Sequence, residues 1–188
     1  MTDLCIVRHG ETAWSRSGQH TSYTDLELTA QGRAEALALR GRLHPEDFDL
    51  VLCSPMTRAQ QTAELAGFAD FDIDDDLSEW NYGDFEGRTS EEIRRFVPGW
   101  RIWTDYVPGG EQQADVIERM SRVMNRVRYS RLQRVLAFGH GHSLRVLATC
   151  WINIDISRGA SLPLQTATVS ILGYEKETPA LLAWNARP

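Results

Sequence analysis

A short apolar run near the start of the chain ends abruptly in an arginine, a histidine and a glycine. Residues 4–7 read Leu-Cys-Ile-Val, a pattern typical of a strand that is buried on both faces in a parallel sheet. In open α/β sheets, ligands bind outside the carboxyl ends of the strands. The pattern therefore predicts that Arg8 and His9 stand where a ligand can reach them, and Gly10 lets the backbone turn sharply beside the imidazole.

The same architecture occurs a second time. Residues 135–138 read Val-Leu-Ala-Phe and are followed by Gly139-His140-Gly141-His142-Ser143. A single histidine after a strand is more often a hydrogen-bonded structural residue than a catalyst. The occurrence of two such strand ends in one chain is therefore what favours a functional site. If both runs are strands of one parallel sheet, His9 and His140 meet at a common edge.

The chain length and charge limit the classes of protein to consider. At 188 residues, one domain spanning 1–188 is expected. The formal net charge of −6 argues against a nucleic-acid or membrane partner, because such partners attract basic surfaces. No apolar run approaches the roughly 18 residues of a membrane span, and no basic leader is present, so we expect a cytoplasmic protein. Cys5, Cys53 and Cys150 are widely spaced and are expected to be free thiols.

Apolar runs and helical patterns alternate along the chain. This alternation predicts an α/β fold, a three-layer α/β/α sandwich with a mostly parallel central sheet. A short helical insertion at about 88–111 is expected to lie over the active site, and residues 13–27 are expected to form a long loop. The expected strands are 4–7, 50–53, 71–73, 135–138, 167–172 and 181–184, and the expected helices are 29–43, one starting at 54–55, 112–132 and 143–151.

Two further charged residues stand in suggestive surroundings. Ser54 and Pro55 form a helix-start signal, with serine as the N-cap and proline at the first helical position. Arg58 then lies near the positive end of a helix, where a cation is unfavourable unless it is held for an anion. An exposed surface arginine would be the simpler interpretation of this segment alone. Glu79 lies in a glycine- and aromatic-rich loop beside Trp80.

Together these residues can supply the groups that phosphoryl transfer needs. The reaction requires a nucleophile in line with the leaving oxygen, cations on the equatorial oxygens and an acid for the departing alkoxide. Histidines at two strand ends, two arginines and one glutamate provide all three without a metal. Each arginine can bind phosphate oxygens through two N–H groups.

Four stretches in this order resemble the motifs of the histidine phosphatase superfamily, in its phosphoglycerate-mutase-like branch. The resemblance implies that His9 becomes phosphorylated and that Glu79 donates and accepts the proton. It also implies that Arg8, Arg58 and His140 hold the phosphoryl group, with no cofactor and no metal. The stretches are Arg8-His9-Gly10-Glu11-Thr12; residues 54–62; Leu77-Ser78-Glu79 with Tyr82-Gly83 and Glu86-Gly87; and Gly139-His140-Gly141-His142-Ser143-Leu144-Arg145.

Within this family, the loop after Thr12 is similar to that of acid phosphatase and sedoheptulose-bisphosphatase members. Ser15 stands where the common family pattern has asparagine, and a hydroxyl reaches less far than an amide. The short insertion between Gly87 and Gln112 favours water over a second substrate, hence hydrolysis of a small phosphorylated metabolite. Substrate contacts are expected from Ser15, Thr21, Ser22, Trp80, Tyr82 and Gly141.

Other interpretations stay open at this point. A cofactor-dependent phosphoglycerate mutase shares the opening motifs, and a non-catalytic phosphate-binding module would fit if the nucleophile or acid were lost. His140 and His142 could bind a metal as alternate residues on one face, although Gly141 interrupts the strand. His142 is expected to line or support the pocket, and His20 is expected in a loop from which it can reach the substrate, but their roles stay open. A homodimer contact through the aromatic insertion is compatible with either function.

Overall fold

The centre of the molecule is a six-stranded mixed sheet in the strand order β3-β2-β4-β1-β5-β6. The structure is a computed structural model that describes residues 1–188. The pairs β3–β2, β2–β4 and β4–β1 are parallel, whereas β5 pairs antiparallel with β1 and with β6. The strands are β1 (Asp3–Arg8), β2 (Leu50–Cys53), β3 (Asp72–Ile73), β4 (Arg134–Gly139), β5 (Val169–Glu175) and β6 (Thr178–Ala186).

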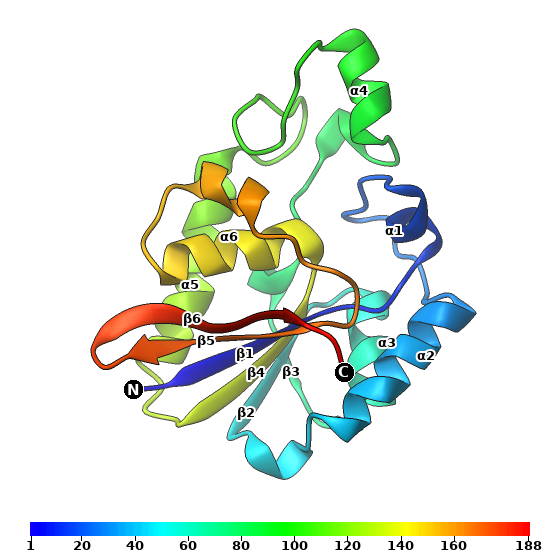
Figure 1. The fold of residues 1–188 in the computed structure, drawn as a ribbon. Helices are drawn as coiled ribbons and strands as arrows, with labels where there is room; N and C mark the ends of the chain where they lie inside the picture. The colour runs from blue at the N-terminus through cyan, green and yellow to red at the C-terminus, as the bar shows by residue number, and fades with distance from the viewer.

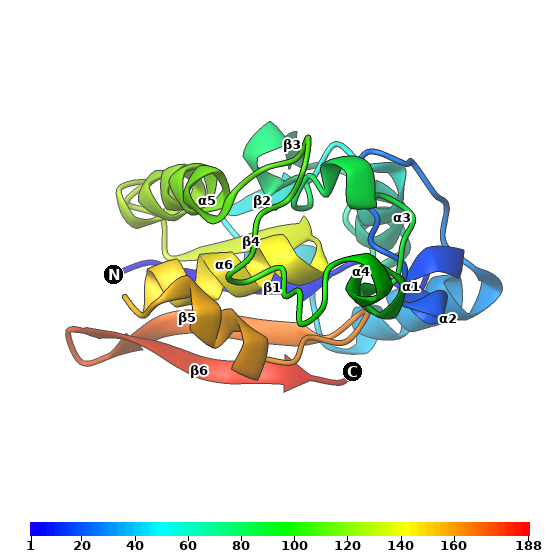
Figure 2. The same ribbon diagram turned by 90° about the horizontal axis from the view of Figure 1, so that it is seen from above.

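Helices cover both faces of this sheet (Figures 1 and 2), so the predicted three-layer sandwich is confirmed. Helices α5 and α6 pack together on one face, and α2 and α3 on the other. Figure 1 shows α1 and α4 at one end of the molecule, away from the chain terminus marked N. The helices are α1 (Ala13–Ser17), α2 (Ala30–Ala38), α3 (Thr57–Leu65), α4 (Ser90–Phe96), α5 (Gln113–Arg128) and α6 (Gly141–Trp151).

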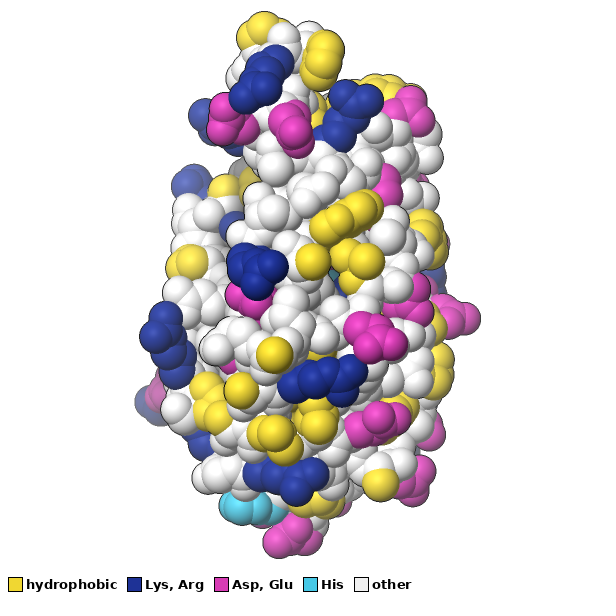
Figure 3. All heavy atoms as spheres, turned by 90° about the vertical axis from the view of Figure 1, so that its right-hand side faces the viewer, with side chains coloured by type: hydrophobic (Ala, Val, Ile, Leu, Met, Phe, Trp, Pro, Cys, Tyr) yellow, Lys and Arg dark blue, Asp and Glu magenta, His cyan; other side chains and the backbone are white.

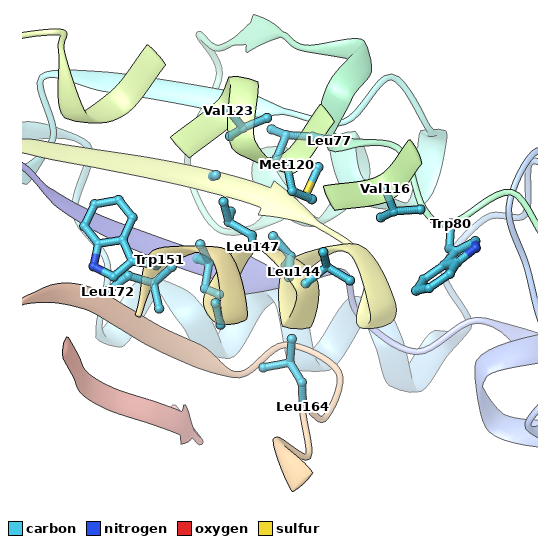
Figure 4. Packing of buried hydrophobic residues seen from close by; sticks show 14 of the residues in the cluster. Leu77, Trp80, Val116, Met120, Val123, Leu144, Leu147, Trp151, Leu164 and Leu172 are labelled. Atoms are coloured by element: carbon cyan, nitrogen blue, oxygen red, sulfur yellow. The ribbon is translucent and has the colours of Figure 1, made fainter. Parts of the chain in front are cut away.

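Two separate cores explain why the four middle residues of β1, 4–7, are all apolar. Side chains alternate between the faces of a strand, so Leu4 and Ile6 join one core and Cys5 and Val7 the other. The larger core lies under α5 and α6, where the side chains of both helices meet above the sheet (Figure 4). The smaller core lies under α2 and α3 and includes Ala59. A strand buried on both faces is the pattern expected of a central parallel strand.

The first loop contains a helix that the sequence pattern did not predict. Residues 13–17 form α1, although residues 13–27 were expected to lack regular structure. Thr12 caps this helix by accepting a hydrogen bond from the Ser15 N–H, and the Ser15 hydroxyl in turn accepts one from the Thr12 N–H. Gly18 ends it in the left-handed conformation, with a φ of 80°. Five residues are too few for hydrophobic periodicity to show, so only the capping residues signal this helix.

The helix after β2 begins two residues later than predicted. Helix α3 starts at Thr57, so Ser54 is not its N-cap and Pro55 is not its first residue. The Ser54 hydroxyl instead bonds His140. Asp25 from the first loop accepts hydrogen bonds from the main-chain N–H and the hydroxyl of Thr57. The first N–H group of the helix, which has no partner within the helix, is thereby paired.

Other bounds differ by a few residues. Helix α2 ends at Ala38 and continues as a 3-10 turn over Leu39–Gly41 instead of running to residue 43. The C-terminal pair forms an antiparallel hairpin, with Pro179 in the edge strand β6, as its sequence predicted. The remaining 3-10 helices are Pro45–Asp47, Asp75–Leu77, Gly83–Phe85 and Ile156–Ser161.

The surface shows how charge is distributed on one side of the molecule. On the face turned to the viewer in Figure 3, basic side chains are scattered among neutral ones and do not form one continuous patch.

Two expectations about the whole chain can be compared with the structure. All three cysteines are free. None of the helices combines the length and the apolar composition that a bilayer span requires.

Candidate active site

The pairing of β1 with β4 brings the two strand-end histidines together. Arg8 stands opposite Gly139 in this parallel pair, so His9 and His140 each follow directly at the same edge of the sheet. Their rings meet edge to face with centroids 5.2 Å apart. The expected common edge is therefore present.

His9 is held in one tautomer. Its Nδ1 lies 2.7 Å from the carbonyl oxygen of Gly10, an acceptor, so Nδ1 carries the proton and donates it. The lone pair of Nε2 is then free for attack. Burial lowers the pKa of His9 well below its usual value, and the guanidinium groups of Arg58 and Arg8 lower it further. His9 is therefore neutral and nucleophilic at neutral pH.

Gly10 is required by close backbone packing as well as by the turn. A β-carbon at this position would lie 2.4 Å from the carbonyl oxygen of Gly32 in α2. The Gly10 N–H also donates to the hydroxyl of Thr62 in α3. These contacts fix the main chain immediately after His9 against the helices of one layer.

His140 is fully buried, and both of its ring nitrogens are engaged. Arg58 Nε donates to His140 Nδ1 at 3.2 Å, so the proton lies on Nε2 and is donated to the Ser54 hydroxyl at 2.7 Å. Burial, followed by the charge of Arg58, lowers the pKa of His140 well below its usual value. His140 is therefore neutral and fixed in orientation. Neither histidine of the metal-site alternative is unpartnered, since His142 Nδ1 bonds the Tyr82 hydroxyl at 2.7 Å.

Arg58 is a buried residue and not a surface arginine. Arg58 is the second residue of α3, and its side chain has no exposed surface. The two Nη atoms donate to the carbonyl oxygens of Thr21, Ser22 and Thr24 in the first loop. A buried guanidinium that is balanced by neutral carbonyls keeps a net positive charge, which suits an anionic ligand.

The guanidinium of Arg8 is held at the pocket wall. Its Nη1 donates to the Leu164 carbonyl at 2.6 Å, whereas its Nε is buried without a partner. Gly141 lets the guanidinium approach, because a β-carbon there would lie 3.3 Å from Arg8 Cζ. A guanidinium in a pocket wall can offer its remaining N–H groups to the oxygens of an anionic ligand.

Glu79 is fixed by three main-chain N–H groups. Its Oε1 accepts from Trp80 and from Ser143, and its Oε2 accepts from His142 at 3.0 Å. The latter two donors belong to the first turn of α6, where main-chain N–H groups have no partner within the helix. The carboxyl is buried, with 7% of the residue exposed. Glu79 therefore presents its oxygens in one defined direction.

His9 and Glu79 open into one pocket of about 240 Å³. Arg8 forms part of its wall, whereas Arg58 and His140 lie behind the residues that line it. A larger and more open cavity of about 630 Å³ shares Arg8 and Ser15 but contains neither His9 nor Glu79. The smaller pocket is therefore the candidate active site, since both His9 and Glu79 line it.

Four of the six residues predicted to contact substrate lie in the pocket wall: Ser15, Thr21, Tyr82 and Gly141. The structure places the other two elsewhere. The Ser22 hydroxyl points to Glu86, and the Trp80 ring is fully buried in the larger core (Figure 4), where its Nε1 donates to the Glu111 carbonyl. An irregular loop has no side-chain period, so the direction of these two residues could not be read from the sequence.

Several wall residues were not predicted as substrate contacts. Arg145 belongs to the fourth motif and could have been proposed from its position one turn into the helix after His140. Its pKa is lowered to about 10, mainly by burial. No sequence signal marked Ser90 or Leu164, which come from distant segments. The wall residues not named as substrate contacts are Gly18, Gln19, Ser90, Arg145 and Leu164; His142 and His20, which the sequence placed near the pocket without a defined role, also line it.

The buried histidines predict a loss of stability in acid. Burial lowers the pKa of His9, His20, His140 and His142 in the folded protein, that of His20 to about 4. The unfolded chain therefore takes up protons first as the pH falls through 6.5, and the free energy of unfolding decreases. Each histidine contributes at most about 1.4 kcal/mol per pH unit. We expect the urea midpoint to fall from pH 7 to pH 5, and to fall less in His20→Gln; an unchanged midpoint would contradict this.

Comparison with known proteins gives a consistent family assignment. The model of the histidine phosphatase superfamily, branch 1, matches residues 4–187. An acid phosphatase of Mycobacterium tuberculosis is 40% identical over 176 residues, covering 92% of this chain and 86% of that protein. The sedoheptulose 1,7-bisphosphatase of Saccharomyces cerevisiae is 34% identical over 191 residues, covering 84% and 70%.

Mutases are also among the relatives. A 2,3-bisphosphoglycerate-dependent phosphoglycerate mutase of Methylobacterium is 36% identical over 194 residues, covering 93% of this chain and 92% of that protein. Among solved structures, an open-reading-frame product of Mycobacterium tuberculosis superposes with a TM-score of 0.93 at 36% identity, covering 99% and 98% of the two chains.

Proposed function

Since the chain belongs to branch 1 of the histidine phosphatase superfamily, we propose that it hydrolyses small phosphomonoesters through a phosphohistidine at His9. One observation carries the proposal: the free Nε2 of His9 and the oriented carboxyl of Glu79 face the same pocket. Phosphoryl transfer through a covalent intermediate requires at least a nucleophile and a general acid that line the same cavity.

In the first half-reaction, Nε2 of His9 attacks the phosphorus, and the bond from phosphorus to the ester oxygen breaks. Glu79 gives its proton to the departing oxygen, so an alcohol leaves. Arg8, which lines the pocket, offers N–H groups of its guanidinium to a phosphoryl oxygen, and Arg58 adds positive charge from behind the pocket wall. Because these cations are fixed before substrate arrives, little reorganisation is needed when charge develops on the oxygens.

In the second half-reaction, water replaces the alcohol. Glu79, now a carboxylate, accepts a proton from the water as its oxygen attacks phosphorus. The bond between phosphorus and Nε2 breaks, phosphate leaves, and His9 returns to the neutral form that its surroundings favour. The guanidinium groups supply the positive charge throughout, and we propose that no metal ion or other cofactor is needed.

The wall beyond Glu79 supports a small, hydroxyl-bearing leaving group. His20 bonds Ser90 through Nε2, and burial lowers the pKa of His20 and of His142, so both imidazoles are neutral. Tyr82 adds a hydroxyl, and burial raises its pKa. Neutral donors and acceptors in a pocket of about 240 Å³ match the hydroxyls of a small metabolite better than a large apolar group.

The alternatives have less support. A mutase must retain a bisphosphate between half-reactions, and the only helix of the insertion, α4, has seven residues. A non-catalytic module would not need both His9 and Glu79 in reactive positions. The three free thiols support a reducing, cytoplasmic compartment for the enzyme.

Phosphate release provides the direct test. We expect the protein to hydrolyse p-nitrophenyl phosphate, and one or more members of a panel of phosphorylated sugars, glycerates and nucleotides, with undiminished rate in excess EDTA. A rate that chelation abolishes and a divalent cation restores would contradict the metal-independent mechanism. Absence of phosphate release from every compound would contradict the function itself.

A further inference from the structure

Glu86, from the third motif, has no part in the mechanism described above, yet its carboxylate holds the first loop. The main-chain N–H of Ser22 donates to both carboxylate oxygens, at 2.9 and 3.0 Å, and the Ser22 hydroxyl donates to Oε2. The N–H of Thr24 donates to Oε1 at 3.2 Å. Glu86 itself is not part of the pocket wall.

The opposite side of the same loop segment binds Arg58. Its guanidinium donates to the carbonyl oxygens of Thr21, Ser22 and Thr24 at 3.0–3.3 Å, while Nε donates to His140. These bonds use four of the five N–H groups of an arginine. The loop carbonyls therefore decide where the guanidinium points.

Segment 21–24 thus lies between two charged groups. A carboxylate binds its N–H groups, and a guanidinium binds its carbonyl oxygens. The peptide unit between Thr21 and Ser22 takes part in both sets, since its N–H donates to Glu86 and its carbonyl oxygen accepts from Arg58, so the carboxylate polarises and orients this unit. Moving the segment changes the acceptors of Arg58, and through Arg58 the orientation of His140.

Residues 19 and 20, which precede segment 21–24 in the first loop, are bound to the chain of the insertion by separate main-chain contacts. The His20 N–H donates to the Arg88 carbonyl at 2.9 Å, and the Gly87 N–H donates to the His20 carbonyl at 2.8 Å. Gln19 also pairs with Thr89 in an isolated bridge. Removing the carboxylate of Glu86 would therefore loosen segment 21–24 while the loop stays attached to the insertion.

From these contacts we propose that Glu86 is a positioning residue, which aims the guanidinium of Arg58 at the phosphoryl site by holding segment 21–24. The proposal rests on the phosphatase function proposed above, because it assumes that the charge of Arg58 acts on the phosphoryl group. It places the effect of Glu86 at the phosphate end of the substrate and not at the leaving group.

The test is Glu86→Gln, which keeps the size of the side chain but replaces one acceptor oxygen by a donor. We expect the inhibition constant of inorganic phosphate to rise about tenfold, and kcat/KM to fall to a similar degree for substrates with different leaving groups. Urea unfolding and circular dichroism check that the variant is folded. Glu91→Gln is the matched control, since Glu91 is exposed on α4 and pairs only with Arg95.

A double-mutant cycle separates positioning from a general structural role. In an Arg58→Lys background the guanidinium is absent, so Glu86→Gln is expected to add less than a twofold change in the phosphate inhibition constant. An equal effect in both backgrounds, or a Glu86→Gln enzyme with wild-type phosphate inhibition, would overturn the proposal. Both outcomes require an active wild-type enzyme, so they differ from a failure of the proposed function, in which the wild type itself releases no phosphate.

Discussion

Replacing His9 by alanine is expected to lower kcat for p-nitrophenyl phosphate by at least about 1,000-fold. Alanine removes the only atom placed to attack phosphorus, the Nε2 that is left free when Nδ1 donates to the Gly10 carbonyl. His140 cannot replace it, because Arg58 and Ser54 already engage both of its ring nitrogens. Initial rates with purified wild-type and variant protein measure the loss.

Covalent trapping identifies the reason for the loss. Wild-type enzyme that is quenched during turnover should carry an acid-labile, base-stable phosphoryl group on His9, and His9→Ala should carry none. His44→Ala is the matched control, because His44 is exposed in a turn and lies outside the pocket. A His9→Ala enzyme that keeps more than about a tenth of the wild-type rate would contradict the mechanism.

The parts of the fold that depend on burial could be predicted from the sequence. A strand that is covered on both faces needs consecutive apolar residues, and residues 4–7 and 135–138 carry them. Once both strands are parallel neighbours, the register places His9 beside His140 without further information. The central sheet and the placement of His9 beside His140 therefore follow from local composition and one rule of topology.

The direction of side chains in irregular segments could not be predicted in this way. Ser22 lies in the first loop and Trp80 directly follows Glu79, but Ser22 turns to Glu86 and Trp80 turns into the core. Their neighbours Thr21 and Glu79 turn into the pocket instead. Tertiary contacts, which no local pattern encodes, select between these directions.

For Arg58, the sequence predicted a cation beside an anion site but not the groups that orient its guanidinium. A cation at a helix start indicated an anion site, yet the sequence could not show that loop carbonyls at least 34 residues away would accept hydrogen bonds from most of its N–H groups. Those acceptors matter for the chemistry, because a guanidinium that is already oriented loses little freedom when phosphate binds. The pairing with His140 arises in the same way, from two segments that meet only in the folded protein.

Replacing Glu79 by glutamine is expected to lower kcat by about 100- to 10,000-fold for alkyl phosphomonoesters, the contribution typical of a positioned general acid and base. Glutamine is nearly the same size, but it cannot give a proton to an alkoxide or take one from water. Of the three N–H groups that fix the carboxyl, one would face the new amide NH₂, so a modest change in stability is also expected.

The leaving group distinguishes the two roles of Glu79. p-Nitrophenolate departs without a proton, so the first half-reaction of Glu79→Gln should stay fast with p-nitrophenyl phosphate while attack by water becomes slow. A burst of p-nitrophenol that matches the enzyme concentration, followed by slow turnover and accumulation of phosphohistidine, is therefore expected in stopped-flow and quench measurements. The wild type and the exposed-residue control Glu91→Gln should show no burst, and a smaller fraction of their His9 should be phosphorylated during turnover than in Glu79→Gln. If Glu79→Gln lost the same factor with aryl and alkyl substrates and showed no burst, Glu79 would not be the acid and base of this reaction.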